Sequence, residues 1–336
     1  MATTKRRLFK NPFAKTKLKE PAADKPWREY KDLKNGGWWV NNTEEWDGND
    51  EKRKPYYKTQ LENIKETTEH VLKEVDGVTA KHVNIMMLGY VQSGKSSTIN
   101  SIYSVLHGKI CKRAKSGSSD TSYTQRYESF PGEKELNDVV LFDIMGVEGV
   151  QNQGLMNEDI QSCINGEIED NYLFDPRTKK KVAGNFMDQE VHCVMYCVDA
   201  ESIFQEIIQP VQKRMQEIES QLRLTMQDRI VLVTKIDTIC DDTKEDITKI
   251  FHSNNIKKVV ERAASVFRVP LNQVFPIKNY TDETETDENK NIPLLLALQK
   301  AVDFGADYLQ KTAANARRKS NQQKEVLETK EQQTEI

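Results

Sequence analysis

The feature that most constrains the fold is a glycine-rich stretch, "GYVQSGKS", which follows an apolar run and precedes a helical pattern. It begins at Gly89, ends at Ser96 and reads G-x-x-x-x-G-K-S. Its two glycines let the backbone curl so that successive N–H groups point at phosphate oxygens. The lysine adds a positive charge over the β- and γ-phosphates, and the serine hydroxyl can ligate Mg²⁺. We therefore expect a phosphate-binding loop that consists of Gly89, Val91, Gln92, Ser93, Gly94, Lys95, Ser96 and Ser97.

Strand and helix patterns alternate through the rest of the chain. Strands are expected at residues 82–88, 124–130, 138–143, 190–200, 229–237 and 273–279. Helices are expected at residues 96–108, 203–224 and 242–267, with a last helix that begins near Pro293. Several strands are continuously apolar, which is typical of a mostly parallel sheet that helices cover on both faces. The sequence therefore predicts an α/β fold of three layers.

The chain divides into segments of different character. All four tryptophans fall within residues 27–46, and apolar residues recur at helical spacing from Tyr57 to Val75. We expect the tryptophan-rich stretch to dock on the main domain, because each ring can bury a large apolar area. The expected organisation is a basic and then tryptophan-rich segment at 1–50, a lead-in helix at 51–78, a nucleotide-binding domain at 79–312 with an insertion near 147–189, and a polar extension at 313–336.

Composition and charge narrow the surroundings in which the chain works. No apolar run approaches the roughly 20 residues that a membrane-spanning helix needs, so no transmembrane segment is predicted. Five scattered cysteines give neither a disulfide framework nor a zinc spacing, which indicates a reducing, cytoplasmic location. Residues 1–34 carry eleven Lys or Arg against four Asp or Glu. We interpret this arm as a solvated tail, with contact to an anionic surface as the alternative, and find no DNA-binding motif.

A second motif, "LFDIMG", supplies groups for the metal side of a nucleotide site. Asp143 ends an apolar strand 48 residues after Lys95, where its carboxylate could reach Mg²⁺ through water. Gly146 follows three residues later and could offer its backbone N–H to a γ-phosphate. We expect Ser96 and Asp143 on the metal, together with a threonine from the first switch segment. Either Thr121 or Thr124 could serve, and we favour Thr124 because it stands where the next strand starts.

A third motif, "TKID", distinguishes between the purine bases. Thr234, Lys235 and Asp237 end a buried strand, and the carboxylate can accept hydrogen bonds from the N1 and exocyclic N2 groups of guanine. Adenine lacks both donors, so Asp237 would be left without a partner, which is costly for a buried charge. In "FPIKN", we expect the backbone near Ile277 and Lys278 to face the guanine edge.

The residue after the "DIMG" glycine bears on turnover. Many small GTPases place a glutamine there to orient the attacking water, whereas Val147 occupies the position here and its side chain can neither donate nor accept a hydrogen bond. We therefore expect slow intrinsic hydrolysis, no faster than the order of 10⁻⁴–10⁻³ s⁻¹, and assign no catalytic residue. Arg113 and Arg126 flank the first switch segment, but solvated arginines are the favoured interpretation of both.

In this order the motifs resemble the GTPase family of P-loop proteins, over about residues 80–310. More closely, "GYVQSGKSS", "LFDIMG", "HCVMYCVDA", "TKID" and "VFPIKNY" are similar to the interferon-induced protein 44 family, as is the upstream "PWR". The resemblance implies a P-loop NTPase fold of the G-domain type that binds GTP or GDP with Mg²⁺, in a cytosolic protein of the innate antiviral response. Longer members of that family carry an additional N-terminal domain, for which we find no counterpart in this sequence.

Three functions remain open from the sequence. The leading one is a guanine-nucleotide switch or slow GTPase, with an effector protein or a second copy of the chain as partner. An ATP-dependent phosphotransferase is the second, and it would leave "TKID" without a role. The third is a scaffold whose bound nucleotide is barely hydrolysed, which Val147 keeps open. Base selectivity separates the first from the second, and turnover separates the first from the third.

Overall fold

The computed structural model describes Trp27 and residues 56–75, 80–115, 126–147, 155–174, 184, 186–204, 209–222 and 229–334. Thr121 and Thr124 lie outside these residues, as do the other three tryptophans. The Trp27 ring packs against Phe251, with ring centroids 5.2 Å apart. Its backbone N–H donates to the Phe251 carbonyl at 2.9 Å. This tryptophan thus contacts the main domain.

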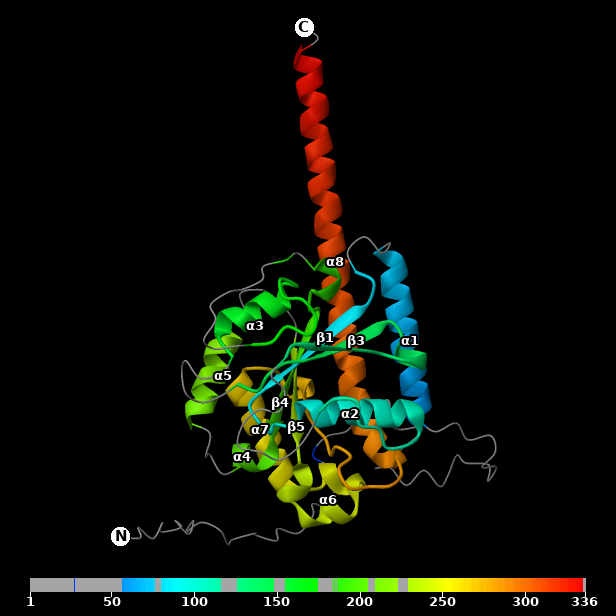
Figure 1. Cartoon of the computed structure of the whole chain (residues 1–336), viewed down its shortest axis with the longest axis vertical. Helices are drawn as coiled ribbons and strands as arrows, with labels where there is room; N and C mark the ends of the chain where they lie inside the picture. The colour runs from blue at the N-terminus through cyan, green and yellow to red at the C-terminus, as the bar shows by residue number, and fades with distance from the viewer. Residues whose placement is uncertain are drawn as a thin grey trace, which may run out of the picture.

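A six-stranded sheet forms the centre of the molecule, with the strand order β2-β3-β1-β4-β5-β6 (Figure 1). β2 pairs antiparallel with β3, and every other neighbouring pair is parallel. The carboxyl ends of the parallel strands therefore meet at one edge of the sheet. The strands are β1 (Val83–Gly89), β2 (Glu128–Pro131), β3 (Val139–Asp143), β4 (Cys193–Asp199), β5 (Arg229–Thr234) and β6 (Val274–Pro276).

Helices cover both faces of this sheet. One hydrophobic cluster joins α1, α2 and α8 to one face, and the other joins α3, α4, α5 and α7 to the opposite face. This confirms the predicted three-layer α/β fold with a mostly parallel central sheet. The helices are α1 (Tyr56–Glu74), α2 (Lys95–His107), α3 (Asn157–Ile164), α4 (Ala200–Phe204), α5 (Gln209–Leu222), α6 (Asp241–Glu245), α7 (Asn254–Phe267) and α8 (Glu288–Thr334).

Some predicted boundaries are wrong. The continuous helix expected at 242–267 is instead α6, a 3₁₀ helix η7 (Ile247–Phe251) and α7. The Asp246 carboxylate accepts from the Thr248 N–H at 3.0 Å, and the Ser253 hydroxyl accepts from the Ile256 N–H at 3.3 Å. Each side chain starts a new helix because it satisfies a first-turn N–H group. The last helix begins at Glu288, ahead of Pro293.

The described parts of the insertion after β3 pack against the sheet. The Asn171 N–H donates to the Tyr127 carbonyl at 2.7 Å, and the Tyr127 N–H donates to the Tyr172 carbonyl at 2.9 Å, just before β2. Farther along, the Asp188 carbonyl accepts from the Asn84 side-chain amide at 2.9 Å, near the start of β1. The insertion therefore pairs with the residues just before the edge strand β2, at the carboxyl ends of the parallel strands. It also contacts the sheet near the amino end of β1.

Helix α8 is much longer than the sheet it covers. Its first half packs beside α1, and its second half extends beyond the body of the molecule (Figure 1). Residues 314–324 are exposed on all sides. No helix within the described residues is long and apolar enough to cross a membrane.

Candidate functional site

The glycine-rich loop joins β1 to α2 at the carboxyl edge of the sheet, and its glycines are required by close contacts. A Cβ atom on Gly89 would lie 2.3 Å from the Cys197 carbonyl oxygen on β4. Gly94 has φ +95°, a left-handed conformation that side chains rarely adopt, and it lies against Thr234 of β5. A backbone contact with β4 therefore excludes a side chain at Gly89, and the left-handed φ disfavours one at Gly94.

Lys95 lies inside this loop, with only 6% of its surface exposed. Its Nζ donates to the Gly89 carbonyl at 3.3 Å and to the Tyr90 carbonyl at 3.2 Å. Burial lowers the pKa of this ammonium, and the attraction of Asp143 opposes that effect. The ammonium is thus enclosed by loop carbonyls at the position where a phosphate group would offer stronger acceptors.

Ser96 and Asp143 meet, as the sequence predicts for residues that share a metal. The Ser96 hydroxyl donates to Asp143 Oδ2 at 2.5 Å, and Asp143 is 1% exposed at the end of β3. The described residues include no cluster of three or more His, Cys, Asp or Glu that could hold a metal on its own. A serine hydroxyl and a carboxylate do fit Mg²⁺, which takes a few protein oxygens and completes its shell with water and substrate phosphates.

The segment after Asp143 runs directly against the phosphate loop. A Cβ on Gly146 would lie 2.7 Å from the Val91 nitrogen. The next residue, Val147, donates its backbone N–H to the Gly89 carbonyl at 3.0 Å. The Val147 side chain is 1% exposed within the hydrophobic core, so it points away from solvent and cannot position a water.

The base-side motif continues from β5 and is tied to the phosphate loop. The Thr234 hydroxyl donates to the Ser93 carbonyl at 2.8 Å, and Lys235 Nζ donates to the Gln92 carbonyl at 2.7 Å. Asp237 lies beyond them, and its Oδ2 is 3.9 Å from Lys278 Nζ. Among the described residues no group donates a hydrogen bond to the Asp237 carboxylate, so its oxygens are open to a ligand.

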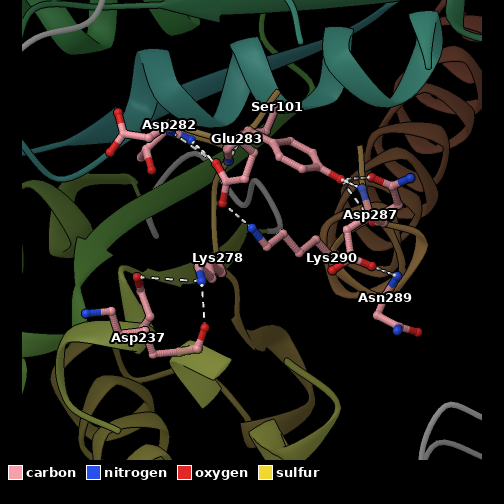
Figure 2. A network of polar contacts seen from close by, with 12 residues as sticks. Ser101, Asp237, Lys278, Asp282, Glu283, Asp287, Asn289 and Lys290 are labelled. Carbon is pink, nitrogen blue, oxygen red and sulfur yellow. Dashed lines mark hydrogen bonds and ion pairs between the residues drawn. The ribbon is translucent and has the colours of Figure 1, made fainter. Parts of the chain in front are cut away.

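The two residues expected at the guanine edge, Ile277 and Lys278, differ in the hydrogen-bond donors that they have available. The Ile277 N–H donates to the Val233 carbonyl at 2.8 Å, and its side chain is 1% exposed. This N–H is used inside the sheet and is not available to a base, and the expectation that the backbone near Ile277 and Lys278 faces the guanine edge stays a prediction. Lys278 is the next residue, and its side chain lies opposite Asp237 (Figure 2).

Neither arginine near the first switch segment points at the phosphate loop. The Arg113 guanidinium pairs with Glu133 at 2.9 Å and lies over the Tyr103 ring. Arg126 donates to the Asn171 carbonyl at 2.8 Å. Both side chains are exposed and make these local contacts.

Two polar contacts at the site were not predicted. The Tyr90 hydroxyl donates to Asp199 Oδ2 and accepts from the Asp199 N–H at 2.8 Å, although the two residues are 109 positions apart. Asn279 Nδ2 donates to the Thr98 hydroxyl at 3.0 Å and ties the base-side loop to α2. Asn279 stands within "FPIKN", and Asp199 ends a strand, but neither pattern identifies the partner.

Comparison with known proteins finds relatives of similar sequence. The chain is 26% identical over 238 residues to human interferon-induced protein 44-like, which covers 68% of this chain and 52% of that protein. It is 26% identical over 244 residues to human interferon-induced protein 44, covering 70% and 54%. The mouse interferon-induced protein 44 matches at 25% over 252 residues, covering 71% and 58%. This chain therefore spans about half the length of the curated relatives that it matches.

No family model matches the chain. Among solved structures, a probable GTP-binding protein engB is 16% identical, covers 58% of this chain and 88% of its own, and has a TM-score of 0.34. Toc33 from Arabidopsis thaliana, in complex with GDP and Mg²⁺, is 13% identical, covers 74% and 95%, and has a TM-score of 0.38. The resemblance read from the sequence motifs is confirmed by the curated matches: the chain has homologues that are named interferon-induced protein 44.

Proposed function

We propose that the chain binds GTP and GDP with Mg²⁺ and hydrolyses GTP slowly, as a nucleotide-dependent switch. The observation that carries the proposal is the meeting, at one edge of the sheet, of a buried phosphate loop and an open carboxylate. The loop carbonyls of Ser93 and Gln92 accept hydrogen bonds from Thr234 and Lys235, which stand three and two residues before Asp237. A ligand with phosphates at one end and a hydrogen-bonding base at the other would contact both.

At the phosphate end, the loop N–H groups and the Lys95 ammonium would bind the phosphate oxygens. Ser96 and Asp143 would hold Mg²⁺, which neutralises charge between the β- and γ-phosphates. We keep Thr124 as the proposed third protein group on the metal. Gly146 would offer its N–H to the γ-phosphate, because its backbone already lies against the loop at Val91.

At the base end, Asp237 would accept from guanine N1–H and N2–H. An ATP-dependent phosphotransferase remains the less favoured function, because adenine would leave this carboxylate without a donor. The open carboxylate supports guanine in particular.

Slow turnover follows from what surrounds the γ-phosphate position. Val147 is buried in the core, and the guanidinium groups of Arg113 and Arg126 are engaged elsewhere. None of these three residues therefore acts as a water-orienting glutamine or as an arginine finger in the arrangement described. The same observation favours a second function, a scaffold that holds nucleotide almost without hydrolysing it.

The cellular role can be proposed only from the relatives. Their names indicate induction by interferon, and we propose that this chain acts in the innate antiviral response in the cytoplasm. An effector protein or a second copy of the chain would read the nucleotide state. The basic N-terminal arm is proposed to stay solvated or to contact anionic surfaces.

The direct test is calorimetric titration of nucleotide-free protein with GDP, GTP and ADP, with and without Mg²⁺, followed by phosphate release. Guanine-selective, Mg²⁺-dependent binding with slow release is the expected result. Binding without any release would favour the scaffold, and equal affinity for ADP and GDP would contradict the role of Asp237.

The Asp237→Asn variant tests the base assignment on its own. An amide donates where the carboxylate accepts, so we expect GDP affinity to fall about 100-fold and xanthosine diphosphate to become the preferred ligand, by exchange of a donor–acceptor pair. Asp242→Asn, on the exposed face of α6, is the control and should leave GDP affinity unchanged. Full GDP affinity in the Asp237 variant would place the base elsewhere.

A further inference from the structure

The side chain of Lys278 lies at the base end of the candidate site, opposite Asp237. Its Nζ is 3.9 Å from Asp237 Oδ2 and donates to the Lys244 carbonyl, at the end of α6, at 3.2 Å (Figure 2). Only 13% of the Lys278 side chain is exposed, against 28% for Asp237. A lysine with so little exposure is held in place rather than free in solvent.

An ammonium group has three N–H donors, and the described contacts of Lys278 use one of them in a hydrogen bond. The carboxylate at 3.9 Å lies beyond hydrogen-bond distance and attracts the ammonium without taking up a donor. Lys278 therefore has donor capacity left on the side of the site where Asp237 is open.

The backbone just before Lys278 has no free N–H group, so the Lys278 side chain is the nearby donor that we consider for a ligand. Pro276 has no N–H, and the Ile277 N–H is used by the Val233 carbonyl. The two residues before Lys278 thus give no donor to a ligand. A base carbonyl that arrives beside Asp237 would find its donors on Lys278.

Guanine carries such a carbonyl. Its O6 is bonded to the carbon next to N1, so a carboxylate that accepts from N1–H lies beside O6. A donor a few ångströms from that carboxylate is within reach of O6. Resting on the guanine site proposed above, we propose that the Lys278 ammonium donates a hydrogen bond to guanine O6 and is a specificity-determining residue of this site.

The loop that carries Lys278 is fixed from both sides. The Tyr280 N–H donates to the Ser101 hydroxyl of α2 at 3.0 Å, and the Tyr280 hydroxyl donates to Asn291 Oδ1 of α8 at 2.7 Å. Farther along, Glu283 pairs with Lys290. Although burial raises the pKa of Glu283, the hydrogen bonds from Lys290 and from the Thr281 N–H lower it to about 2. The pair is therefore ionised at neutral pH, and Lys278 projects from a rigid loop.

Ligand analogues test the contact without changing the protein. GDP and inosine diphosphate both carry O6 and N1–H, and only GDP carries the N2 amino group. The 2-aminopurine riboside diphosphate keeps the amino group and lacks O6 and N1–H. We expect the order of affinity GDP, then inosine diphosphate, then the 2-aminopurine compound, measured by calorimetry with Mg²⁺.

The Lys278→Met variant then identifies the donor. It keeps the unbranched apolar part of the side chain and removes the ammonium, so GDP and inosine diphosphate should each lose about tenfold to hundredfold in affinity, as for a hydrogen bond to a charged group. The 2-aminopurine compound should lose less than about threefold, since it has no O6 to accept that bond. Lys278→Arg retains a cationic donor and should recover part of the GDP affinity.

Lys244→Met is the matched control, because it removes a neighbouring exposed lysine and keeps the carbonyl that Lys278 contacts. It should leave all three affinities unchanged. Thermal unfolding checks that each variant is folded. If a variant does not fold, the affinities of the unchanged protein for the three ligands still test the contact.

An equal loss for all three ligands in Lys278→Met would mean that the lysine acts through charge or folding, and an unchanged GDP affinity would mean that it makes no contact. Either result overturns the inference while the guanine site stands. Unchanged protein that does not prefer GDP over ADP would instead overturn the proposed function.

Discussion

Around the phosphate loop the contacts are made by backbone groups and buried side chains, whereas around Asp237 they are made by partly exposed side chains. Lys95 is 6% exposed and Asp143 is 1% exposed. The Asp237 and Lys278 side chains are 28% and 13% exposed and lie 3.9 Å apart. Both groups of residues lie at the same edge of one sheet. The difference in exposure therefore comes from the local contacts of each group and not from its position in the fold.

This difference indicates how each end should respond to change. A phosphate has the same shape in every nucleotide, so it can be bound by a fixed backbone with tight glycine contacts. A base must be distinguished from similar bases, which requires side-chain donors and acceptors of a particular pattern. Substitutions at the phosphate end should therefore abolish binding of all nucleotides, and those at the base end should change which nucleotide is preferred.

The largest expected effect is that of Lys95→Met. The carbonyls that accept from Lys95 have other donors, the Val147 N–H for Gly89 and the Ser93 N–H for Tyr90. Nucleotide-free protein should therefore keep its unfolding free energy to within about 1 kcal/mol, whereas GDP and ADP should both lose at least about 100-fold in affinity as charge-assisted bonds disappear. Calorimetry and chemical unfolding measure the two quantities.

Lys235→Met, at the base end, should lose less GDP affinity than Lys95→Met. This lysine donates to the Gln92 carbonyl of the loop at 2.7 Å, so about a tenfold loss of GDP affinity is expected for one charge-assisted bond. If both lysine variants lost the same affinity, the contrast between the two ends would fail.

A smaller and more selective effect is expected for Gly146→Ala. The added Cβ would meet the Val91 backbone nitrogen at 2.7 Å, and backbone cannot move aside as a flexible side chain can. The segment should shift away from the loop, so GTP affinity should fall about tenfold or more while GDP affinity falls less, in keeping with the loss of one hydrogen bond to the γ-phosphate. Competition binding of the two nucleotides measures the ratio.

Gly108→Ala is the control for that substitution. Gly108 has φ +63° with no atom within 4 Å of an added Cβ, at the far end of α2. Alanine there should cost about 1 kcal/mol of unfolding free energy through backbone strain and leave nucleotide affinity unchanged. An unchanged GTP-to-GDP ratio in Gly146→Ala would show that this backbone does not sense the γ-phosphate.

The contrast between the two ends also explains what the sequence could and could not predict. Gly89 and Gly94 are recognisable because close contacts and a left-handed φ require glycine at set spacing. The class of the fold followed from buried strands that alternate with helices. At the base end, the use of the Ile277 N–H within the sheet depends on the register of β5 and β6, which no local pattern encodes.

Helix boundaries failed for a related reason. The apolar spacing from 242 to 267 continues through Asp246 and Ser253, so periodicity alone predicts one helix. Both side chains bind N–H groups of the following turn and end the preceding one. The pairing of Tyr90 with Asp199 likewise exists only because β1 and β4 are neighbours in the sheet.

The smallest expected effect compares two tyrosines of the same hydrophobic cluster. Tyr90 belongs to the glycine-rich loop, and its hydroxyl accepts from the Asp199 N–H at 2.8 Å. Tyr127 is fully buried, and within the described residues its hydroxyl has no hydrogen-bond partner. Tyr90→Phe should therefore cost about 1–3 kcal/mol of unfolding free energy, because it leaves a buried N–H without an acceptor.

Tyr127→Phe should instead be neutral, or stabilising by up to about 1 kcal/mol, because it removes a polar group that gains nothing from being buried. The ring keeps its stacking on Phe142, with centroids 5.0 Å apart. Denaturant unfolding of nucleotide-free protein measures both values, and GDP affinity should fall only for Tyr90→Phe. If the two variants lost the same unfolding free energy, the hydrogen bonds of the Tyr90 hydroxyl would contribute no more to stability than the Tyr127 hydroxyl, which has no hydrogen-bond partner within the described residues.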